Sequence, residues 1–556
     1  MAKRLAGLAV ALAVAAAFSS PAAAQKERTS SPGREDAMVE FLTAEVAAQR
    51  GETGPALATM GRLARELRDP QIARRGVELA IRAHAMEPAL EMAILLVELE
   101  PESSLGRDLV ASLVAGRGDL EKAREAIAGF VDASPDKPLL ITQLAYFFGR
   151  YADKAAVLEA TRSITSRYPK LAESRYALGV AALVAGRQEL AKSESEAALA
   201  MKPAWAQAAI LRAQVLKKEA PAEVIPFYRS FVERNPDSRD VRLQLARELA
   251  GARRNAEARQ EFRAVERLSG SDPQIPYAIG LLALQLEDYA DAEVAFRRAL
   301  GMGHPDPGAV YLALGQTAES AKHIDEALDW YRKVDSGDWM RAQMKIATLI
   351  AKRDGLAKGR AYLQSVEPRT QDDRIQMIQI EAQLLRDAKA WQDTFDMLSS
   401  AVKRFPDSFE LLYDRAMAAE RVDRLDVLEA DLRRVIQLKP DYAHAYNALG
   451  YTLADRTDRV EEAYVLIEKA LSLSPDDPFI LDSLGWVQYR RGKLDEALKN
   501  LKSAYENRPD PEIAAHLGEV LWKLGRKDEA NKVWKTALSE HPDHETLLAI
   551  IHKFEP

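Results

Sequence analysis

Apolar positions along most of the chain recur at helical spacing, and short polar turns separate the apolar runs. The segment SLGWVQYRRGKLDEALKNLKSAYENRP, residues 483–509, has this pattern in its clearest form. It predicts two helices, Ser483–Arg491 and Leu494–Asn507, joined by a turn at Gly492. Gly485 lies inside the first helix, where glycine costs about 1 kcal/mol relative to alanine. A glycine there indicates close approach of another backbone, and we expect its partner to be Ala497 in the second helix.

The same marks recur along the chain at intervals close to 34 residues. A small residue heads each unit at Gly518, Gly485, Gly450, Ala416, Ala382, Ala347, Gly315, Gly280, Ala246, Ala213, Gly179, Ala145 and Ala111, with weaker members at Val77 and Ala44. A second small residue follows twelve positions later at Ala123, Ala191, Ala258, Ala292, Ala327, Ala497 and Ala530. A proline closes many units, at Pro135, Pro169, Pro203, Pro236, Pro406, Pro440, Pro475, Pro509 and Pro542.

Each mark has a physical reason. Two facing small residues let the two helices of a unit approach closely, and proline ends the second helix because it cannot donate a backbone hydrogen bond. Large side chains such as Phe296, Tyr331 and Trp534 follow the second small residue by four positions, and we expect them to fill the space between adjacent units. One unit cannot bury this surface alone, so the pattern predicts a stacked solenoid.

The pattern resembles the tetratricopeptide repeat, a helix pair that recurs every 34 residues. In residues 483–509 the matching marks are Leu484-Gly485, Tyr489, Ala497, Leu501, Ala504 and Pro509. The resemblance implies an all-α, right-handed superhelical solenoid of about fifteen helix pairs, with a C-terminal capping helix at Leu547–Lys553. Degenerate repeat-like helices are expected over residues 36–108, the regular array over 109–542 and the cap within 543–556.

The N-terminal residues differ from the rest. Lys3 and Arg4 precede an apolar run from Leu5 to Phe18, and Ala22-Ala23-Ala24 fits a signal-peptidase site. We expect a cleaved signal peptide over residues 1–24 and a flexible polar leader over 25–35; the alternative is a buried N-terminal helix. The run is too short for a comfortable membrane span, and no later segment is long and apolar enough for one.

Composition narrows the function. The net charge of −7, with no concentrated basic run, argues against nucleic acid as the main partner. The chain has no cysteine, which excludes disulfides, thiolate metal sites, a cysteine nucleophile and the usual lipoprotein anchor. We therefore expect an exported protein without the usual lipid anchor.

Candidate chemistry is sparse. Histidines are scattered, and the one local cluster, His541, His544 and Glu545, lies where a helix stops and lacks the i, i+4 spacing of a helical metal motif. Neither a phosphate-binding loop nor a nucleophile elbow occurs. The sequence predicts no catalytic residue, metal or cofactor, and we expect a protein that is not an enzyme.

A solenoid presents a long concave wall. Relative to Gly485 and its equivalents, residues on the first helix of each pair should face this wall, and aromatic and arginine side chains there are typical of binding hot spots. The predicted partner-binding residues are Tyr413, Asn447, Tyr451, Asp482, Trp486, Tyr489, Arg490, His516, Trp522 and Lys523. The alternative is that Tyr489 and Trp522 pack only within their own units.

Residues 448–542 carry a further resemblance, in ALGYTLADR, SLGWVQYRRG and AAHLGEVLWKLGRKDEA. They are similar to the C-terminal half of an exported bacterial repeat family that includes the lipoprotein adaptor of the carboxy-terminal processing protease. This resemblance implies a non-catalytic adaptor that binds the processing protease and delivers cell-wall hydrolases to it. The absence of the lipidated cysteine departs from that adaptor, and together with the resemblance it implies a protein that is soluble in the Gram-negative periplasm. The alternative is a scaffold for envelope polysaccharide export or outer-membrane assembly.

Overall fold

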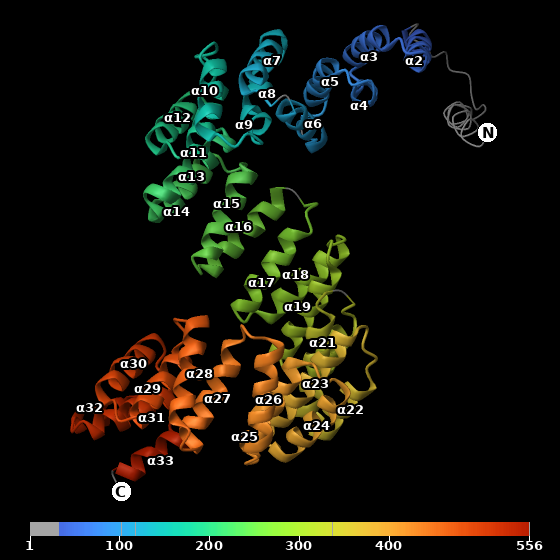
Figure 1. Ribbon diagram of the computed structural model, residues 1–556. Coiled ribbons are helices and arrows are strands. Elements are labelled where there is room, and N and C mark those ends of the chain that lie inside the picture. The colour runs from blue at the N-terminus through green and yellow to red at the C-terminus, as the bar shows by residue number, and fades with distance from the viewer. Residues whose placement is uncertain (1–32, 102, 117, 269, 336, 555–556) are drawn as a thin grey trace. The chain divides into compact units, whose positions relative to one another are not determined.

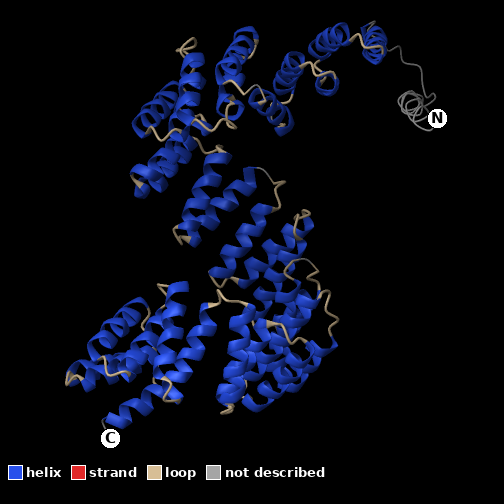
Figure 2. Ribbon diagram, in the orientation of Figure 1, coloured by secondary structure: helices blue, strands red, loops and turns tan. Residues whose placement is uncertain are grey.

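The computed structural model describes residues 33–554, apart from 102, 117, 269 and 336. Over these residues the chain forms helices and no strand (Figure 2). Successive helices pack as antiparallel pairs, here termed helix A and helix B of each pair (Figure 1). The predicted all-α tetratricopeptide solenoid is therefore confirmed. The chain divides into two compact units, residues 1–270 and 271–556.

In the first unit the described helices run from α2 to α16. Their bounds are α2 Gly33–Gln49, α3 Thr53–Leu67, α4 Pro70–Arg82, α5 Met86–Leu99, α6 Ser104–Ala115, α7 Leu120–Ala133, α8 Lys137–Thr142, α9 Leu144–Phe147, α10 Lys154–Thr165, α11 Ala172–Val184, α12 Gln188–Met201, α13 Ala206–Glu219, α14 Val224–Arg234, α15 Arg239–Gly251 and α16 Asn255–Leu268. A short 3₁₀ turn, Pro221–Glu223, precedes α14. Helix A of one pair is broken into α8 and α9 at Gln143.

The second unit continues the pairs and ends with a single helix. Its helices are α17 Gln274–Gln285, α18 Tyr289–Gly301, α19 Pro307–Ser320, α20 Ile324–Arg332, α21 Trp339–Asp354, α22 Leu356–Ser365, α23 Gln371–Asp387, α24 Trp391–Arg404, α25 Phe409–Arg421, α26 Leu425–Leu438, α27 Ala443–Arg456, α28 Val460–Leu473, α29 Pro478–Arg490, α30 Leu494–Asn507, α31 Pro511–Lys523, α32 Lys527–Glu540 and α33 Glu545–Phe554. The last of these is the expected capping helix, and it packs on α31 and α32.

Helix boundaries follow the local chemistry of the chain. The predicted helix B, Leu494–Asn507, is confirmed as α30, and Pro509 follows its end by two residues. The predicted start of helix A at Ser483 is wrong, because α29 begins at Pro478. Asp477 caps this earlier start by accepting hydrogen bonds from the backbone N–H groups of Phe479 and Ile480 at 2.9 and 3.2 Å. Proline is favoured in the first helical turn, where its missing N–H is not needed.

The glycine of helix A makes room for a side chain of helix B in the same pair. A Cβ placed on Gly485 would lie 2.5 Å from Cγ of Leu501 and 3.2 Å from the carbonyl oxygen of Ala497. The predicted close approach is present, but its main partner is Leu501 and not Ala497. Likewise Phe296 covers Gly280, with the ring 2.6 Å from a Cβ built there. These large side chains therefore pack within their own pair. The buried clusters that contain Phe296 and Leu501 also include residues of the next pair, as expected.

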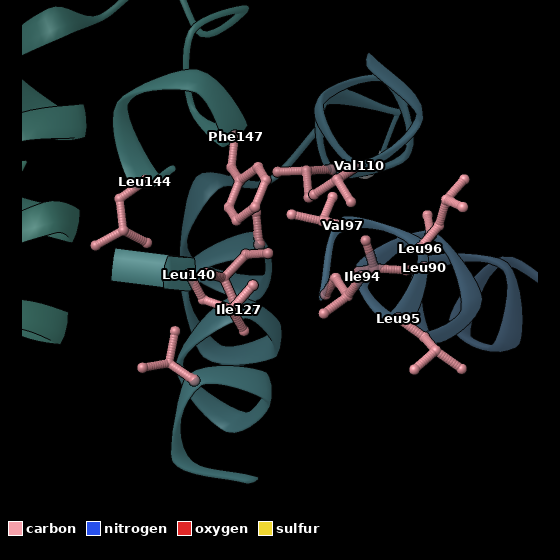
Figure 3. Close-up of a cluster of buried hydrophobic side chains, with 14 of the residues drawn as sticks. Leu90, Ile94, Leu95, Leu96, Val97, Val110, Ile127, Leu140, Leu144 and Phe147 are labelled. Carbon is pink, nitrogen blue, oxygen red and sulfur yellow. The ribbon is translucent and has the colours of Figure 1, made fainter. Parts of the chain in front are cut away.

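Apolar side chains from successive pairs merge into continuous cores. Figure 3 shows one such cluster in the first unit, in which Leu90 and Ile94 of α5, Ile127 of α7 and Phe147 of α9 are all buried. Burial across pair boundaries is what makes stacked repeats stable, since no single pair encloses its apolar surface.

The predicted signal peptide, residues 1–24, lies outside the described residues, as does the leader up to residue 32. Helix α2 begins at Gly33, so residues 33–35 at the end of the expected leader are helical. Among the described helices, none has both the length and the apolar character that crossing a membrane requires.

Candidate functional site

Helices A of the last pairs lie side by side and form one continuous surface. Helix α29 contacts both α27 and α31, and α31 contacts α33, in addition to the contacts that each makes with its own helix B. The surface curves enough for residues two pairs apart to meet. The hydroxyl of Tyr451 on α27 lies 3.4 Å from Nε2 of His516 on α31. We call this surface the C-terminal wall and define it by helices α27, α29 and α31 together with α25, whose Tyr413 contacts Tyr442 just before α27.

A buried histidine–aspartate pair lies at the centre of the wall. Nδ1 of His516 donates to the carboxylate of Asp482, with both oxygens at 3.0 Å. The indole of Trp486 stacks on the imidazole, with ring centroids 4.3 Å apart. His516, Asp482 and Trp486 expose only 6%, 6% and 8% of their surface, so they form the floor of the wall and not its exposed face.

Burial and nearby charges shift the pKa values of the His516 imidazole and the Tyr451 hydroxyl. Burial lowers the pKa of His516, but the charge and hydrogen bond of Asp482, with help from Glu512 and Asp455, outweigh it and leave the pKa raised. Burial also raises the pKa of Tyr451, and nearby carboxylates on α25, α27, α29 and α31 raise it further. The Tyr451 hydroxyl therefore stays protonated and can accept from or donate to Nε2 of His516 in either charge state of the ring.

The end of the wall is built around a second buried carboxylate. Glu519 on α31 is 2% exposed, and its Oε1 accepts hydrogen bonds from the Tyr489 hydroxyl at 3.1 Å and from Nζ of Lys553 at 3.0 Å. Burial, together with Glu519, raises the pKa of Tyr489 to about 12. Tyr489 thus bonds across to the next pair and does not pack only within its own unit.

Trp522 joins the wall to the capping helix. Its ring stacks on Trp534 of its own pair at 5.8 Å and lies 5.7 Å from the ring of Phe554 on α33. Lys523 is exposed beside it, with Nζ 5.9 Å from the Phe554 ring. The side chain of Trp522 is therefore half-buried and serves packing, while its neighbour Lys523 faces solvent.

The other end of the wall is half-buried and polar. Tyr413 packs edge-on against Tyr442 at 5.4 Å, and burial raises its pKa to about 12. Glu420, also half-buried, has its pKa raised by burial. Arg490 donates to the backbone carbonyl oxygens of Ala454 and Asp455, the latter at 3.2 Å, so it links α29 to α27.

Three polar atoms of the wall are buried and lack a hydrogen-bond partner. They are Oδ1 of Asn447, Nε1 of Trp486 and Oε2 of Glu519. Leaving such an atom unpaired costs about 1–3 kcal/mol, and each unpaired group in a native structure needs an explanation. A bound segment that supplied a donor to the half-buried Asn447 would remove one of these costs, whereas Nε1 of Trp486 lies in the buried floor of the wall.

The predicted wall residues therefore divide into a buried floor of Asp482, Trp486 and His516, a half-buried layer and an exposed rim. The half-buried group comprises Tyr413, Asn447, Tyr451, Tyr489 and Trp522, and the exposed rim comprises Arg490 and Lys523. Lys553 and Phe554 were missed, although the apolar periodicity at the C-terminus did predict the helix that carries them. Nothing in the spacing of that helix indicated that it would complete the wall.

The described residues contain no group of three or more histidine, aspartate or glutamate side chains placed to hold a metal ion. In the His541 and His544 segment, Nδ1 of His544 accepts a hydrogen bond from the backbone N–H of Leu547 at 3.4 Å, at the start of α33. That arrangement is a helix cap. The wall offers aromatic faces, carboxylates and hydrogen-bonding groups, which are the means of binding a protein segment.

Comparison with known proteins agrees with this architecture. Tetratricopeptide repeat families match residues 277–339, 443–477 and 483–545. The TPR repeat-containing protein PA4667 of Pseudomonas aeruginosa is 31% identical over 477 residues, which are 85% of this chain and 80% of that protein.

Solved structures match with lower identity. A thermophilic TPR protein of Thermus thermophilus is 22% identical, covering 31% of this chain and 94% of its own, with a TM-score of 0.29. A tetratricopeptide repeat protein of Parabacteroides merdae is 14% identical, covering 50% of this chain and 97% of its own, with a TM-score of 0.33. The family matches and the similarity to the Pseudomonas protein over most of both chains agree with the repeat geometry. The chain therefore belongs to the tetratricopeptide repeat family.

Proposed function

We propose that this protein is an exported, non-catalytic adaptor that binds a carboxy-terminal processing protease and delivers cell-wall hydrolases to it. Membership of the tetratricopeptide repeat family supports the coarser role of a protein-binding scaffold. The resemblance of residues 448–542 to the exported adaptor family supports the finer role, as does the apolar N-terminal run expected to direct export to the periplasm.

The observation that carries the proposal is the C-terminal wall. It gathers aromatic rings and polar groups from four helices A, and it leaves Oδ1 of the half-buried Asn447 without a hydrogen-bond partner. Arrangements of this kind suit an extended protein segment, whose backbone supplies both donors and acceptors. We assign partner binding to the half-buried layer and the rim, since the floor residues hold the wall together.

The test is affinity capture of the tagged chain, exported in its own host, from a periplasmic extract, with captured proteins identified by mass spectrometry. The wall variant combines Glu420→Ala, Asn447→Ala and Lys523→Ala, which remove wall groups but leave the buried floor intact. The matched control combines Glu506→Ala, Asn507→Ala and Lys469→Ala, exposed residues of the same three types on helices B of the same unit. Circular dichroism verifies that both variants keep their helical content.

We expect the wild-type chain and the control to capture a processing protease together with cell-wall hydrolases, and the wall variant to lose at least one of these partner classes. Capture of polysaccharide-export or outer-membrane assembly components without a protease would overturn the adaptor role in favour of a different scaffold. Equal capture of partners by the wall variant and the control would contradict the assignment of partner binding to the C-terminal wall.

A further inference from the structure

Helix α2, the first described helix, is apolar on two opposite faces. On one face, Ala37 and Ala44 are buried, and Ala44 packs with Ala56 and Met60 of α3. On the other face Met38, Val39, Leu42 and Val46 expose 45%, 63%, 50% and 46% of their surface. A helix that is apolar all round normally lies in a protein interior, so the outer face lacks a cover within the described part of the chain.

The exposed residues form a stripe with coiled-coil spacing. Val39, Leu42 and Val46 follow one another by three and four residues, and Met38 flanks them. The end of a repeat array normally carries a polar outer face that keeps it soluble. An apolar stripe in that place is typical of an interaction surface.

The charges around the stripe are arranged so that the surface is complementary to itself. Asp36 and Arg50 are both exposed and lie on the same flank of the stripe, at opposite ends. The backbone N–H of Arg50 still bonds to the carbonyl oxygen of Val46 at 3.1 Å, which keeps it in helical register. Of the other acidic residues near the stripe, Glu45 is already held by Arg75, with nitrogen–oxygen distances of 2.7 and 2.9 Å.

We propose that α2 pairs in antiparallel orientation with α2 of a second copy of this chain about a two-fold axis. Such pairing brings Leu42 close to Leu42 of the second copy and Val39 close to Val46, and it sets each Asp36 beside the Arg50 of the other copy. Parallel pairing would instead place these residues of the two copies on opposite flanks of the contact, where Asp36 and Arg50 would not meet. Because a single helix contributes the contact, the interface is small and the dimer should form reversibly with rising concentration.

The first experiment measures mass against concentration for the full chain, produced in a host that exports it, by sedimentation velocity. We expect a monomer at low concentration and a dimer at high concentration. Val39→Glu and Leu42→Glu should each weaken the dimer at least tenfold, since each places a carboxylate inside the apolar contact. Val465→Glu is the matched control, because Val465 on α28 is 64% exposed, as Val39 is 63% exposed, and the control should dimerise as the wild type does.

The second experiment tests orientation through charge exchange. Asp36→Arg alone and Arg50→Asp alone should each weaken self-association several-fold, because each opposes like charges across the antiparallel pair. The double variant with both substitutions should recover wild-type association, as should an equimolar mixture of the two single variants. All of these residues are exposed, so loss of association would not reflect unfolding, and circular dichroism checks this for each variant.

A chain that stays monomeric at every concentration would overturn the proposal, as would a dimer that Leu42→Glu leaves unchanged. If the monomer instead binds phosphatidylglycerol vesicles and Leu42→Glu abolishes that binding, the stripe faces a lipid surface and the second copy is excluded. The result is independent of partner capture by the C-terminal wall, which lies in the other unit.

Discussion

At the residue scale, a large side chain of helix B explains the glycine in several helices A, such as Gly280, Gly485 and Gly518. Leu501, which would collide with a Cβ on Gly485, is fully buried. Alanine at this position therefore gains helix propensity but forces a shift of packed side chains. The two effects have opposite signs, and their sizes decide the outcome.

We predict that Gly485→Ala destabilises the second unit by up to about 2 kcal/mol, because overpacking costs about 1–3 kcal/mol and helix propensity returns about 1 kcal/mol. The measurement is the free energy of unfolding in urea, followed by circular dichroism. Gly301→Ala in the same unit is the control, since a Cβ there meets no atom within 4 Å. The control should be neutral or slightly stabilising, and equal behaviour of the two variants would contradict the steric account.

The second prediction concerns the pH dependence of stability, which follows from the His516–Asp482 pair. The pKa of His516 is raised in the folded chain, so the folded state holds the proton more tightly than the unfolded state. The stabilisation is fully present below the unfolded pKa of about 6.5 and is lost as pH rises through the folded pKa. Each pH unit that separates the two pKa values contributes about 1.4 kcal/mol. We expect the free energy of unfolding of the second unit to fall across that window.

Urea unfolding between pH 5 and 9, read by tryptophan fluorescence, measures this effect, because Trp486 stacks directly on the imidazole. His516→Asn should flatten the pH profile. His444→Asn replaces an exposed histidine on α27 and should leave the profile unchanged. A stability that rises with pH over the same range in the wild type would refute the assignment.

At the scale of the element, the capping helix α33 covers apolar surface that the last pair cannot bury alone. Phe554 lies over Trp522 and Trp534, and Lys553 supplies one of the two hydrogen bonds to the buried Glu519 carboxylate. Removing the helix uncovers two indole rings and leaves Glu519 with a hydrogen bond from Tyr489 only. Buried charge that loses its partner is strongly destabilising.

We predict that deleting residues 545–556 loosens α31 and α32 but leaves α25 and α26 as they were, since repeats transmit stability mainly to their neighbours. Hydrogen exchange read by mass spectrometry should show faster exchange in peptides from α31 and α32 and unchanged exchange in those from α25 and α26. Uniform acceleration across the unit would mean that the array unfolds as a single cooperative block.

The elements themselves were largely predictable from sequence, for local reasons. Helix B at Leu494–Asn507 was found because its apolar spacing and Pro509 mark both ends. The start of helix A was missed because Asp477 and Pro478 resemble the end of the preceding turn, whereas in the structure they cap and open α29. Aspartate and proline occur both after the end of one helix and at the start of the next, so only tertiary packing decides which helix they belong to.

The wall was predictable as a list of residues and not as a set of contacts. The repeat placed Asp482, Trp486 and His516 on one face of successive helices A, but their burial depends on how tightly the array curves. Tyr451 and His516 are separated by 65 residues, and their 3.4 Å approach follows from curvature summed over two pairs. The apolar periodicity within one helix pair contains no information on the curvature that accumulates over several pairs.

At the scale of the whole molecule, the repeats divide into two compact units after Gly270. The sequence there, SGSDP at 269–273, is shorter than a linker recognised by composition, so the division was not anticipated. Each unit has its own buried clusters, one around Leu96, Ile127 and Phe147 and another around Leu412, Leu449 and Val487. A unit with its own core is expected to fold alone.

We therefore predict that residues 271–556, produced as a separate chain, fold on their own. Their free energy of unfolding in urea should equal that of the second unit in the full chain within about 0.5 kcal/mol. The comparison requires a probe confined to that unit, and hydrogen exchange of α27–α30 peptides provides one. Gly485→Ala should lower the midpoint equally in the fragment and in the full chain, while peptides from α11 and α12 in the full chain should not respond. If the fragment is unfolded, or if α11 and α12 respond to Gly485→Ala, stability is shared across the division at Gly270 and the two units are one cooperative structure.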